Sequence, residues 1–531
     1  MTKQSWDTKY EKLKPIIDWA IKNNISENII PRSVRQLSEV TEMNMASNQI
    51  MDLPDNFGNL INLTTLDLSV NKLTTLPDNF GSLVNLTTLN LSLNKLTALP
   101  DSFGNLVNLI TLNLNFNSLT NFPDSMINLT QLTELGIANN RLMHLPNCIC
   151  NLTKLEILGA SDCELLELPS WIGELQQLKI LSAHENYLAS LPDSIGCLTE
   201  LNELLVSDNK LITLPSSISK LTQLSLLSIG YNHFSQFPEI ITELHQLKHL
   251  EISGNNLSDI PDSISKLTQL SIINGSDNNF TQFPDALYHV PSLENIHLSN
   301  NQISNITSDI SHLTQLNILK LDSNQLTQLP EALNDIATLE ALILKDNQFT
   351  EIPRCTQVKL LNLSHNQIEQ LSNTLSNSSE LYWLTLDNNK ISTLPDSIGK
   401  MSTLSILALE NNQITALPNN IGNLNQLISL NLDNNQLAEL PDSIGDLKEL
   451  MQLQLDNNQL NEFPASIGQL TNLEVLKFEG NNIKALPKSF QNLTQLPSLI
   501  VILDDYKPSI FRSISHFLYR FLIEPFKRAL S

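Results

Sequence analysis

The chain has 531 residues, and 41% of them are hydrophobic, which is enough for a large core and argues against wholesale disorder. Its net charge of −24 argues against binding to bare nucleic acid, because phosphate recognition needs clustered Lys and Arg. The charge is uneven: +2 over residues 1–40, −29 over 41–504 and +3 over 505–531. The acidic middle is therefore expected to attract basic partners.

The N-terminal segment predicts an amphipathic helix over residues 5–22. Pro15 either kinks this helix or marks its true start, and Asn23 and Asn24 suit its C-terminal end. We interpret residues 1–30 as an N-terminal helical cap. The residues expected to share its apolar face are Trp6, Tyr10, Leu13, Ile17 and Ile21.

A repeat of 23 residues occupies most of the chain. Aligned on the Asn of the pattern LxLxxN, it recurs from Asn48 to Asn481 in 20 turns, with Cys163 in place of Asn once. The step from Asn347 to Asn366 is only 19 residues. A further step of 23 predicts a degenerate final turn at Asp504.

One turn, LNLDNNQL, shows the physical logic of the repeat. Leu430 and Leu432 alternate with Asn431 and Asp433, which predicts a short strand with the leucines inward and the polar residues outward. Asn435 then turns the chain, and its amide can satisfy main-chain groups left open inside the coil. Because no single turn can bury its own leucines, the turns must stack as a solenoid.

The unit LxxLxLxxNxLxxLPxxIGxLxx closely resembles the leucine-rich repeat family over residues 31–504. Its length and its LPxxIGxL half are similar to the intracellular Ras-group subclass and to many bacterial repeat proteins. The resemblance implies an α/β solenoid, a horseshoe of about 20–21 turns with a parallel concave sheet, short helical or irregular convex segments, and helical caps at both ends. The 19-residue step lacks four convex residues between Pro353 and Leu361, which predicts a tighter convex turn beside an intact strand.

Catalytic motifs for phosphate loops, zinc sites and nucleophilic elbows do not occur in the sequence, so we predict a non-enzymatic protein without cofactor or metal. The five cysteines lie inside the repeats, which fits a reducing compartment better than a disulfide framework: Cys148, Cys150, Cys163, Cys197 and Cys355. With no apolar signal segment, the expected location is cytoplasmic; the alternative is export without a classical signal peptide.

Outward strand positions are free to vary, so partner-binding information is expected there. An acidic residue stands two places before the ladder Asn in five consecutive turns, and we name this set the acidic stripe: Asp387, Glu410, Asp433, Asp456 and Glu479. Neighbouring carboxylates repel by roughly 0.2–1 kcal/mol each, whereas Ser69, Ser92 and Ser253 fill the same position without charge. The stripe is either a docking strip for a basic partner or a solvated face kept for solubility.

A second region breaks the polar monotony of the outward positions, and its aromatic residues suit an interface. Contact with a protein or peptide and neutral drift are the two competing interpretations, and the histidines are too dispersed for a metal site. The candidate residues are His184, Leu205, Tyr231, His249, Glu251, His297 and Trp383, with Lys320 and Lys345 nearby.

The C-terminal segment, residues 505–531, is basic and has helical apolar spacing at Ile510, Ile514, Phe517 and Phe521. It is interpreted as a cap on the last turn, with weak contact to an anionic membrane or a partner as the alternative.

These features together predict a protein–protein interaction scaffold that binds a protein partner, in particular a basic one, on its concave face. The family resemblance implies a role in intracellular signalling. The alternatives are a bacterial effector-type repeat protein that acts on host proteins, and a peripheral membrane adaptor that uses the C-terminal helix.

Overall fold

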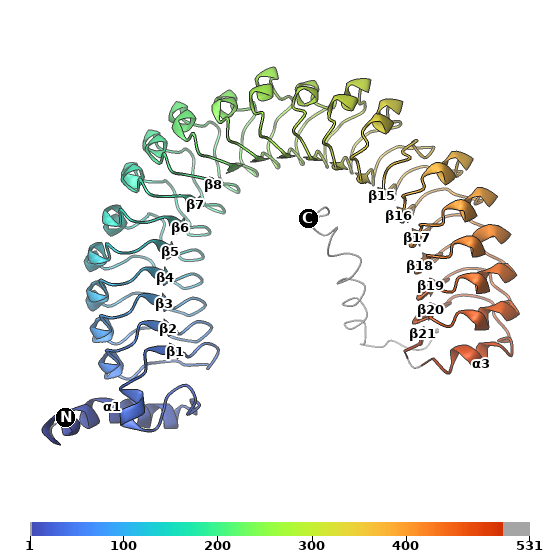
Figure 1. Ribbon diagram of the computed structural model, residues 1–531. Coiled ribbons are helices and arrows are strands. Elements are labelled where there is room, and N and C mark those ends of the chain that lie inside the picture. Colours follow the sequence, from blue (N-terminus) through green and yellow to red (C-terminus); the bar gives the residue numbers. More distant parts are fainter. Residues whose placement is uncertain (1–2, 497, 503–531) are drawn as a thin grey trace. The chain divides into compact units, whose positions relative to one another are not determined.

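The structure, a computed structural model, describes residues 3–496 and 498–502 and divides the chain into two compact units. The first unit is Met1–Asn256 with Lys266–Leu270, and the second is Leu257–Ser265 with Ser271–Ser531. Within each unit, short parallel strands line the inner side of the stack and short helices its outer side (Figure 1). The repeats of the sequence are the turns of these stacks.

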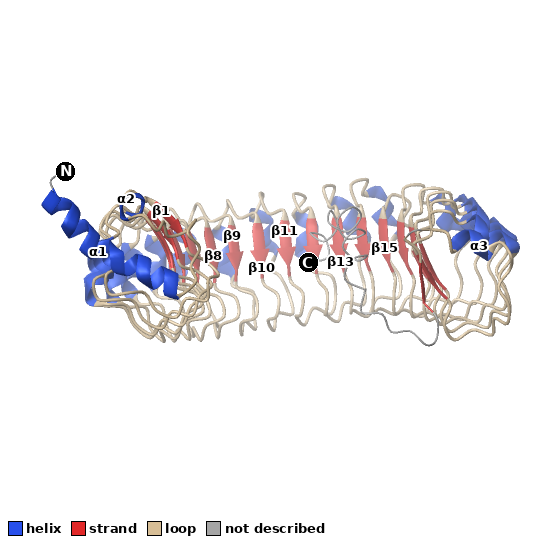
Figure 2. Cartoon of the chain, turned by 90° about the horizontal axis from the view of Figure 1, so that it is seen from below, coloured by secondary structure: helices blue, strands red, loops and turns tan. Residues whose placement is uncertain are grey.

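Each strand is three residues long, and neighbouring strands within each unit pair in parallel register. Figure 2 shows strands of each unit side by side. The first unit contains β1 (Glu42–Asn44), β2 (Thr65–Asp67), β3 (Thr88–Asn90), β4 (Thr111–Asn113), β5 (Glu134–Gly136), β6 (Ile157–Gly159), β7 (Ile180–Ser182), β8 (Glu203–Leu205), β9 (Leu226–Ser228) and β10 (His249–Glu251).

The second unit contains β11 (Ile272–Asn274), β12 (Asn295–His297), β13 (Ile318–Lys320), β14 (Ala341–Ile343), β15 (Leu360–Asn362), β16 (Trp383–Thr385), β17 (Ile406–Ala408), β18 (Ser429–Asn431), β19 (Gln452–Gln454), β20 (Val475–Lys477) and β21 (Ile500–Ile502). With 21 strands described, the predicted solenoid of about 20–21 turns with a parallel sheet is confirmed.

The convex segments are short 3-10 helices, labelled η. They are η1 (Phe57–Asn59), η2 (Phe80–Ser82), η3 (Asp101–Asn105), η4 (Asp124–Asn128), η5 (Asn147–Asn151), η6 (Ser170–Glu174), η7 (Asp193–Cys197), η8 (Ser216–Lys220), η9 (Glu239–Glu243), η10 (Asp262–Lys266), η11 (Asp285–His289), η12 (Ser308–His312), η13 (Glu331–Asp335), η14 (Asn373–Asn377), η15 (Asp396–Lys400), η16 (Asn419–Asn423), η17 (Asp442–Asp446) and η18 (Ala465–Gln469).

The LPxxIG half of the repeat explains these convex helices. Pro441, with φ −68° and ψ 151°, ends the extended segment directly before η17, as the fixed φ of proline favours. Ile444 then points into the core and is 0% exposed. A Cβ added to Gly445 would lie 2.4 Å from the main-chain oxygen of Ser466 in the next turn. Glycine is needed there because neighbouring convex segments pack backbone against backbone.

The Asn ladder is confirmed. The side-chain amide of Asn435 donates to the main-chain oxygens of Leu409 (2.9 Å), Leu432 (3.1 Å) and Asp433 (3.2 Å). Its Oδ1 accepts the N–H of Ile414 at 3.0 Å. Leu409 and Ile414 belong to the preceding turn, so each ladder Asn holds two turns together.

The residue before the ladder Asn adopts a left-handed backbone. Asn434 has φ 54° and Asn457 has φ 53°, a region that Asn, Asp and Gly tolerate better than other residues. Of these two neighbouring Asn residues, Asn434 therefore suits the left-handed backbone, and Asn435 provides the side-chain hydrogen bonds.

The 19-residue step between Asn347 and Asn366 has the shorter convex segment and the intact strand that the sequence predicts. No 3-10 helix is described between β14 and β15, although the two strands remain paired with Ala341 opposite Leu360. The shorter path is tied to the neighbouring turns by polar contacts. Gln357 Nε2 donates to Leu333 O at 2.9 Å, and Ser378 Oγ donates to Cys355 O at 3.1 Å.

The N-terminal segment forms α1 (Lys3–Lys22), which contains Pro15, and a short helix α2 (Val34–Leu37) follows. The predicted apolar face is only partly right: Leu13 and Ile17 are buried, but Tyr10 is 52% and Ile21 55% exposed. Ile16 and Ala20 take the buried positions instead, so the buried face is rotated towards them. The side chain of Trp6 lies outside the described part.

The end of α1 at Asn23 and Asn24 is confirmed by its capping hydrogen bonds. Asn24 is left-handed at φ 56°, and the N–H of Ile25 donates to Ala20 O at 2.9 Å. These bonds satisfy carbonyls that the last helical turn leaves open.

The last described turn departs from the predicted register. A short helix α3 (Phe490–Leu493) replaces the 3-10 helix, and β21 follows β20 by 25 residues, with Val475 opposite Ile500. The predicted step of 23 is therefore wrong by two residues. Asp504 and the predicted C-terminal helix of residues 505–531 lie outside the described residues.

Candidate partner-binding surface

The acidic stripe lies two residues beyond the ends of strands β16–β20, on the side of the sheet that faces away from the leucine core. Asp387, Glu410, Asp456 and Glu479 are half-buried, while Asp433 is only 8% exposed. Asp433 is therefore more buried than the other members of the stripe.

Two carboxylates of the stripe also connect neighbouring turns. Asp433 Oδ1 accepts the N–H of Asp456 at 2.7 Å, and Asp456 Oδ1 accepts the N–H of Glu479 at 2.7 Å. The same bond exists without charge elsewhere, because Asn115 Oδ1 accepts the N–H of Ala138 at 2.7 Å at the equivalent position. An amide is thus sufficient for the fold, and the negative charge is an addition to it.

The charge has an electrostatic cost. Burial raises the pKa of Asp433 to about 6, and the neighbouring carboxylates of Asp456 and Glu410 act in the same direction against Lys477 and a backbone hydrogen bond. Burial likewise raises the pKa of Asp387, against a hydrogen bond donated by Ser364 at 3.2 Å. The other oxygen of Asp387 is buried without a hydrogen-bond partner in the described structure.

The second predicted set of residues is divided between the two units. In the first unit, His249 and Glu251 point outward from the same strand, β10, and Leu205 from β8. Burial lowers the pKa of His249, with Glu251 opposing, and Glu251 accepts the N–H of Ser253 at 3.0 Å.

His184 and Tyr231 of the first unit lie in turns after strands rather than on strands. His184 Nδ1 lies 3.4 Å from a carboxylate oxygen of Glu185. Tyr231 is left-handed at φ 49° and 51% exposed, and a Cβ on Gly254 would lie 2.3 Å from its ring. Tyr231 therefore presents an exposed aromatic ring supported by the next turn.

In the second unit, His297 on β12 is in register with Lys320 on β13. Lys320 is only 7% exposed, and burial lowers its pKa, with Asp322 opposing. The shared role predicted for His184, Leu205, Tyr231, His249, Glu251, His297 and Trp383 remains a hypothesis.

An apolar cluster surrounds Trp383, and the sequence reasoning singled out only that member. Trp383 and Ile318 pack against three outward residues that are at most 5% exposed: Ala341, Ile343 and Leu360. The strand register places Ile318, Ala341, Leu360 and Trp383 in one row, followed by the half-buried Ile406 of β17. We call these six residues the apolar patch.

A different apolar row in the first unit also escaped the sequence reasoning. Val70, Leu93 and Phe116 precede the ladder Asn in successive turns, and they are 47%, 48% and 49% exposed. All three have a left-handed backbone, with φ of 55° to 56°. A β-branched or bulky residue is strained there and gains little from burial, so the row is a second candidate surface. In the sequence, this row is recognisable as an apolar residue directly before the ladder Asn, where Asn or Asp is common.

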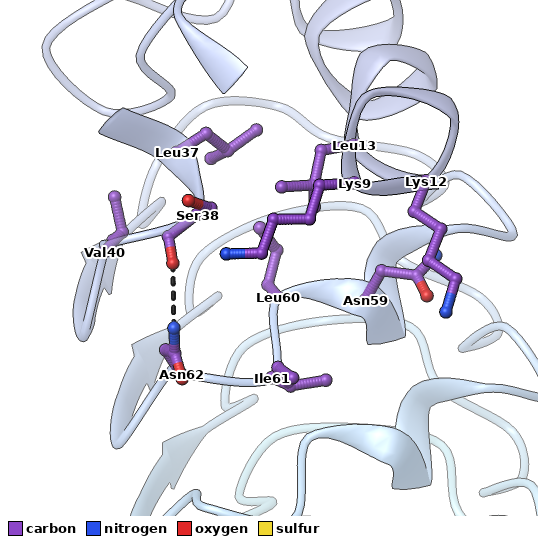
Figure 3. A pocket seen from close by; sticks show the side chains of 10 residues that line it. All are labelled: Lys9, Lys12, Leu13, Leu37, Ser38, Val40, Asn59, Leu60, Ile61 and Asn62. Carbon is purple, nitrogen blue, oxygen red and sulfur yellow. Dashed lines mark hydrogen bonds between the residues drawn. The ribbon is translucent and has the colours of Figure 1, made fainter. Parts of the chain in front are cut away.

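The cavity between α1 and the first turn has a volume of about 350 Å³. Lys9, Lys12 and Leu13 of α1 face Asn59 across it, and Asn62 Nδ2 donates to Ser38 O at 2.8 Å (Figure 3). None of the predicted partner-binding residues lines this cavity, so it forms no part of the candidate surface.

Three cysteines among the described residues are buried. Burial raises the pKa of Cys148 to about 11 and those of Cys163 and Cys355 to about 12, which keeps these thiols protonated. In the described part of the chain, no three His, Cys, Asp or Glu side chains gather as metal ligands would. A helix with the length and apolarity to cross a membrane is likewise not found among the described residues.

Comparison with known families identifies the class of this protein. A model described as leucine-rich repeat region matches residues 21–137, 78–165, 146–232, 215–332 and 355–458. A second model, described as leucine rich repeat, matches residues 448–501. The chain belongs to the leucine-rich repeat family.

Solved structures show the same fold. A leucine-rich repeat protein of Leptospira interrogans is 28% identical, with 89% of this chain and 98% of that chain covered and a TM-score of 0.55. The Arabidopsis receptor kinase HAESA, solved with the peptide hormone IDA and a co-receptor, is 25% identical over 89% and 88%, with a TM-score of 0.57. YopM of Yersinia enterocolitica, 23% identical over 93% and 100% with a TM-score of 0.58, shows likeness of fold alone. No curated protein matches the chain.

Proposed function

We propose that the protein is a non-enzymatic scaffold whose second unit binds a basic protein partner on the inner face of its sheet. The observation that carries the proposal is the charge of the acidic stripe. Asp433 makes the hydrogen bond that Asn115 makes without charge, yet burial raises the pKa of its carboxyl to about 6. A charge that costs stability and is not needed for the bond is best explained by a partner that uses it.

Two further observations support a protein partner. The apolar patch begins on the same face and contains Trp383, a residue type enriched in binding hot spots. The similar structure of HAESA holds a peptide hormone. The cytoplasmic location and the signalling role predicted from the sequence belong to this proposal as well.

The test replaces the charge of the stripe and keeps its hydrogen-bond acceptors. The stripe variant carries Asn for the three Asp residues and Gln for the two Glu residues of the acidic stripe. A matched control neutralises five exposed convex carboxylates in the same way: Asp101, Asp124, Asp193, Asp396 and Asp442.

Both variants and the native chain serve as bait for capture from native lysate, and the retained proteins are quantified by mass spectrometry. The proposal expects a basic partner that is retained by the native chain and the convex control and lost from the stripe variant. Equal retention by all three baits would show that the stripe is only a solvated surface.

A bacterial repeat protein that acts on host proteins is the second candidate. The similarity to the Leptospira interrogans protein over nearly the full length of both chains favours it. Detection of the protein in culture supernatant or host cytosol supports this candidate, and strict retention inside the producing cell contradicts it.

A further inference from the structure

The apolar patch is a long run of apolar residues at the first outward strand position, which other described strands fill with polar residues such as Ser429 or apolar ones such as Ile180. The first outward residue is apolar in five consecutive strands, β13 to β17, and its side chains stand beside one another in register. The inward leucines of these strands, such as Leu342 and Leu384, are 0% exposed and complete the core without them. Ala341, Ile343 and Leu360 are already covered by their neighbours, so the accessible apolar surface of the patch comes from the half-buried Ile318, Trp383 and Ile406.

Acidic side chains border the patch on the turns that follow the same strands. Asp322 follows β13 and Asp387 follows β16, while Asp346 after β14 lies 3.6 Å from Lys345, and Lys320 of β13 is in register with Ile343. A fitting occupant therefore combines a row of apolar side chains with basic ones.

Residues 503–531, which lie outside the described part of the structure, have this chemistry in their sequence. Within it, Ile510, Ile514, Phe517 and Phe521 recur at helical spacing. The basic residues Lys507, Arg512, Arg520, Lys527 and Arg528 give residues 505–531 a charge of +3.

The length of this segment matches the distance to the patch. Residues 503–509 span about 23 Å when extended, at roughly 3.3 Å per residue. Since neighbouring strands are about 4.8 Å apart, this equals roughly five strand spacings, which leads from β21 to β16. Residues 510–523 as a helix add about 21 Å, or roughly four more spacings, which covers β16 to β12.

We propose that residues 503–531 dock on the apolar patch of the same chain, with the apolar residues at helical spacing on the row from Ile318 to Trp383 and the preceding extended residues beside Ile406. Arg512 then lies near Asp387, and Arg520 lies near the acidic residues after β13 and β14. The segment would compete with a partner for the inner face of the second unit, and this consequence rests on the proposed function. The docking of the segment on the patch does not depend on the proposed function.

The test uses the full chain with the photoreactive residue p-benzoylphenylalanine at position 517. After irradiation of the dilute protein, cross-linked peptides are mapped by mass spectrometry. The expected result is cross-links within one molecule to residues 318–408, at a yield that does not change with protein concentration.

Matched variants test the specificity of these cross-links. Ile406→Asp places a charge in the patch, and Ile180→Asp places one at the equivalent half-buried position of β7. With circular dichroism showing both variants folded, the cross-link yield is expected to fall at least fivefold in the first and to stay unchanged in the second. If Ile406→Asp does not fold, Asp387→Asn with Arg512→Glu replaces it and is expected to lower the yield.

Four results would overturn the proposal. Cross-links confined to residues 481–502 would make the segment a cap of the last turn, and cross-links only between molecules would make it an association element. No cross-link to residues 318–408 would leave the patch to another ligand. Loss of the cross-links on adding vesicles of equal parts phosphatidylcholine and phosphatidylserine, with flotation of the chain, would make it a membrane anchor. Partner capture by the stripe is measured separately, so failure of the docking and failure of the proposed function are distinguishable.

Discussion

Replacing Asn435 by Ala tests whether the Asn ladder stabilises the solenoid through particular hydrogen bonds. The substitution removes three donated bonds and one accepted bond. The carbonyls each keep a second donor: Leu409 O has Asn412 Nδ2 at 3.0 Å, Leu432 O has Asn458 Nδ2 at 2.9 Å, and Asp433 O has the N–H of Asn411 at 2.9 Å. The N–H of Ile414 is the group that loses its acceptor.

A buried donor left without an acceptor costs about 1–3 kcal/mol, and this is the expected loss in the free energy of unfolding. Urea denaturation followed by circular dichroism measures it, and hydrogen exchange at the amide of Ile414 localises it. The exposed convex Asn423→Ala is the control and is expected to change stability by less than about 0.5 kcal/mol. An unchanged unfolding midpoint together with unchanged exchange at Ile414 would refute the ladder account.

Three more substitutions give expected outcomes. Cys163→Asn should raise the free energy of unfolding by about 1–3 kcal/mol. In the neighbouring turns, Asn140 and Asn186 each accept a main-chain N–H from the preceding turn, whereas the thiol of Cys163 is a poor acceptor. A lower stability of the variant in urea denaturation would contradict this. Val70→Asn should stabilise by about 1 kcal/mol, since Asn tolerates a φ of 55° better than a β-branched residue, and a lower melting temperature would count against it. Asp433→Asn should raise the free energy of unfolding at pH 8, because burial destabilises the folded state only when the carboxyl is ionised. Since the folded pKa is raised to about 6, that advantage should shrink as the pH falls from about 6 towards 4, and a pH-independent difference in urea melts excludes it.

Most of the fold is encoded locally and could be predicted. Period-2 alternation at Leu430 and Leu432 predicts the strand, the spacing of Asn435 predicts the ladder, and Pro441 marks the end of the extended part. The gap between Pro353 and Leu361 predicts where a convex segment is missing. These predictions succeed because each turn forms the same strand, ladder and convex segment from the same residue pattern.

The errors have a different physical origin. The buried face of α1 depends on how the helix docks on the first turn, so Tyr10 and Ile21 are exposed although their spacing fits an apolar face. The register of β21 fails because the last turn uses α3 in place of a 3-10 helix. Both errors occur at ends, where the repeat no longer dictates the packing.

The candidate surface was harder to predict than the fold. The sequence identifies which letters vary, but not that Asp433 is 8% exposed or that its carboxylate accepts the N–H of Asp456. The apolar patch was missed because its members are 19 or 23 residues apart and each resembles an ordinary strand residue. Only the strand register shows that Ile318 and Trp383 belong to one row.

The central claim, that the charge of the stripe serves a partner, is tested most directly by salt-dependent affinity. The dissociation constant of the captured partner is measured at about 50 mM and 200 mM salt for the native chain, the stripe variant and the convex control. The account predicts that native and control chains bind at least tenfold more weakly at the higher salt concentration, while the stripe variant binds weakly at both. The same affinity and the same salt dependence for all three proteins would contradict it.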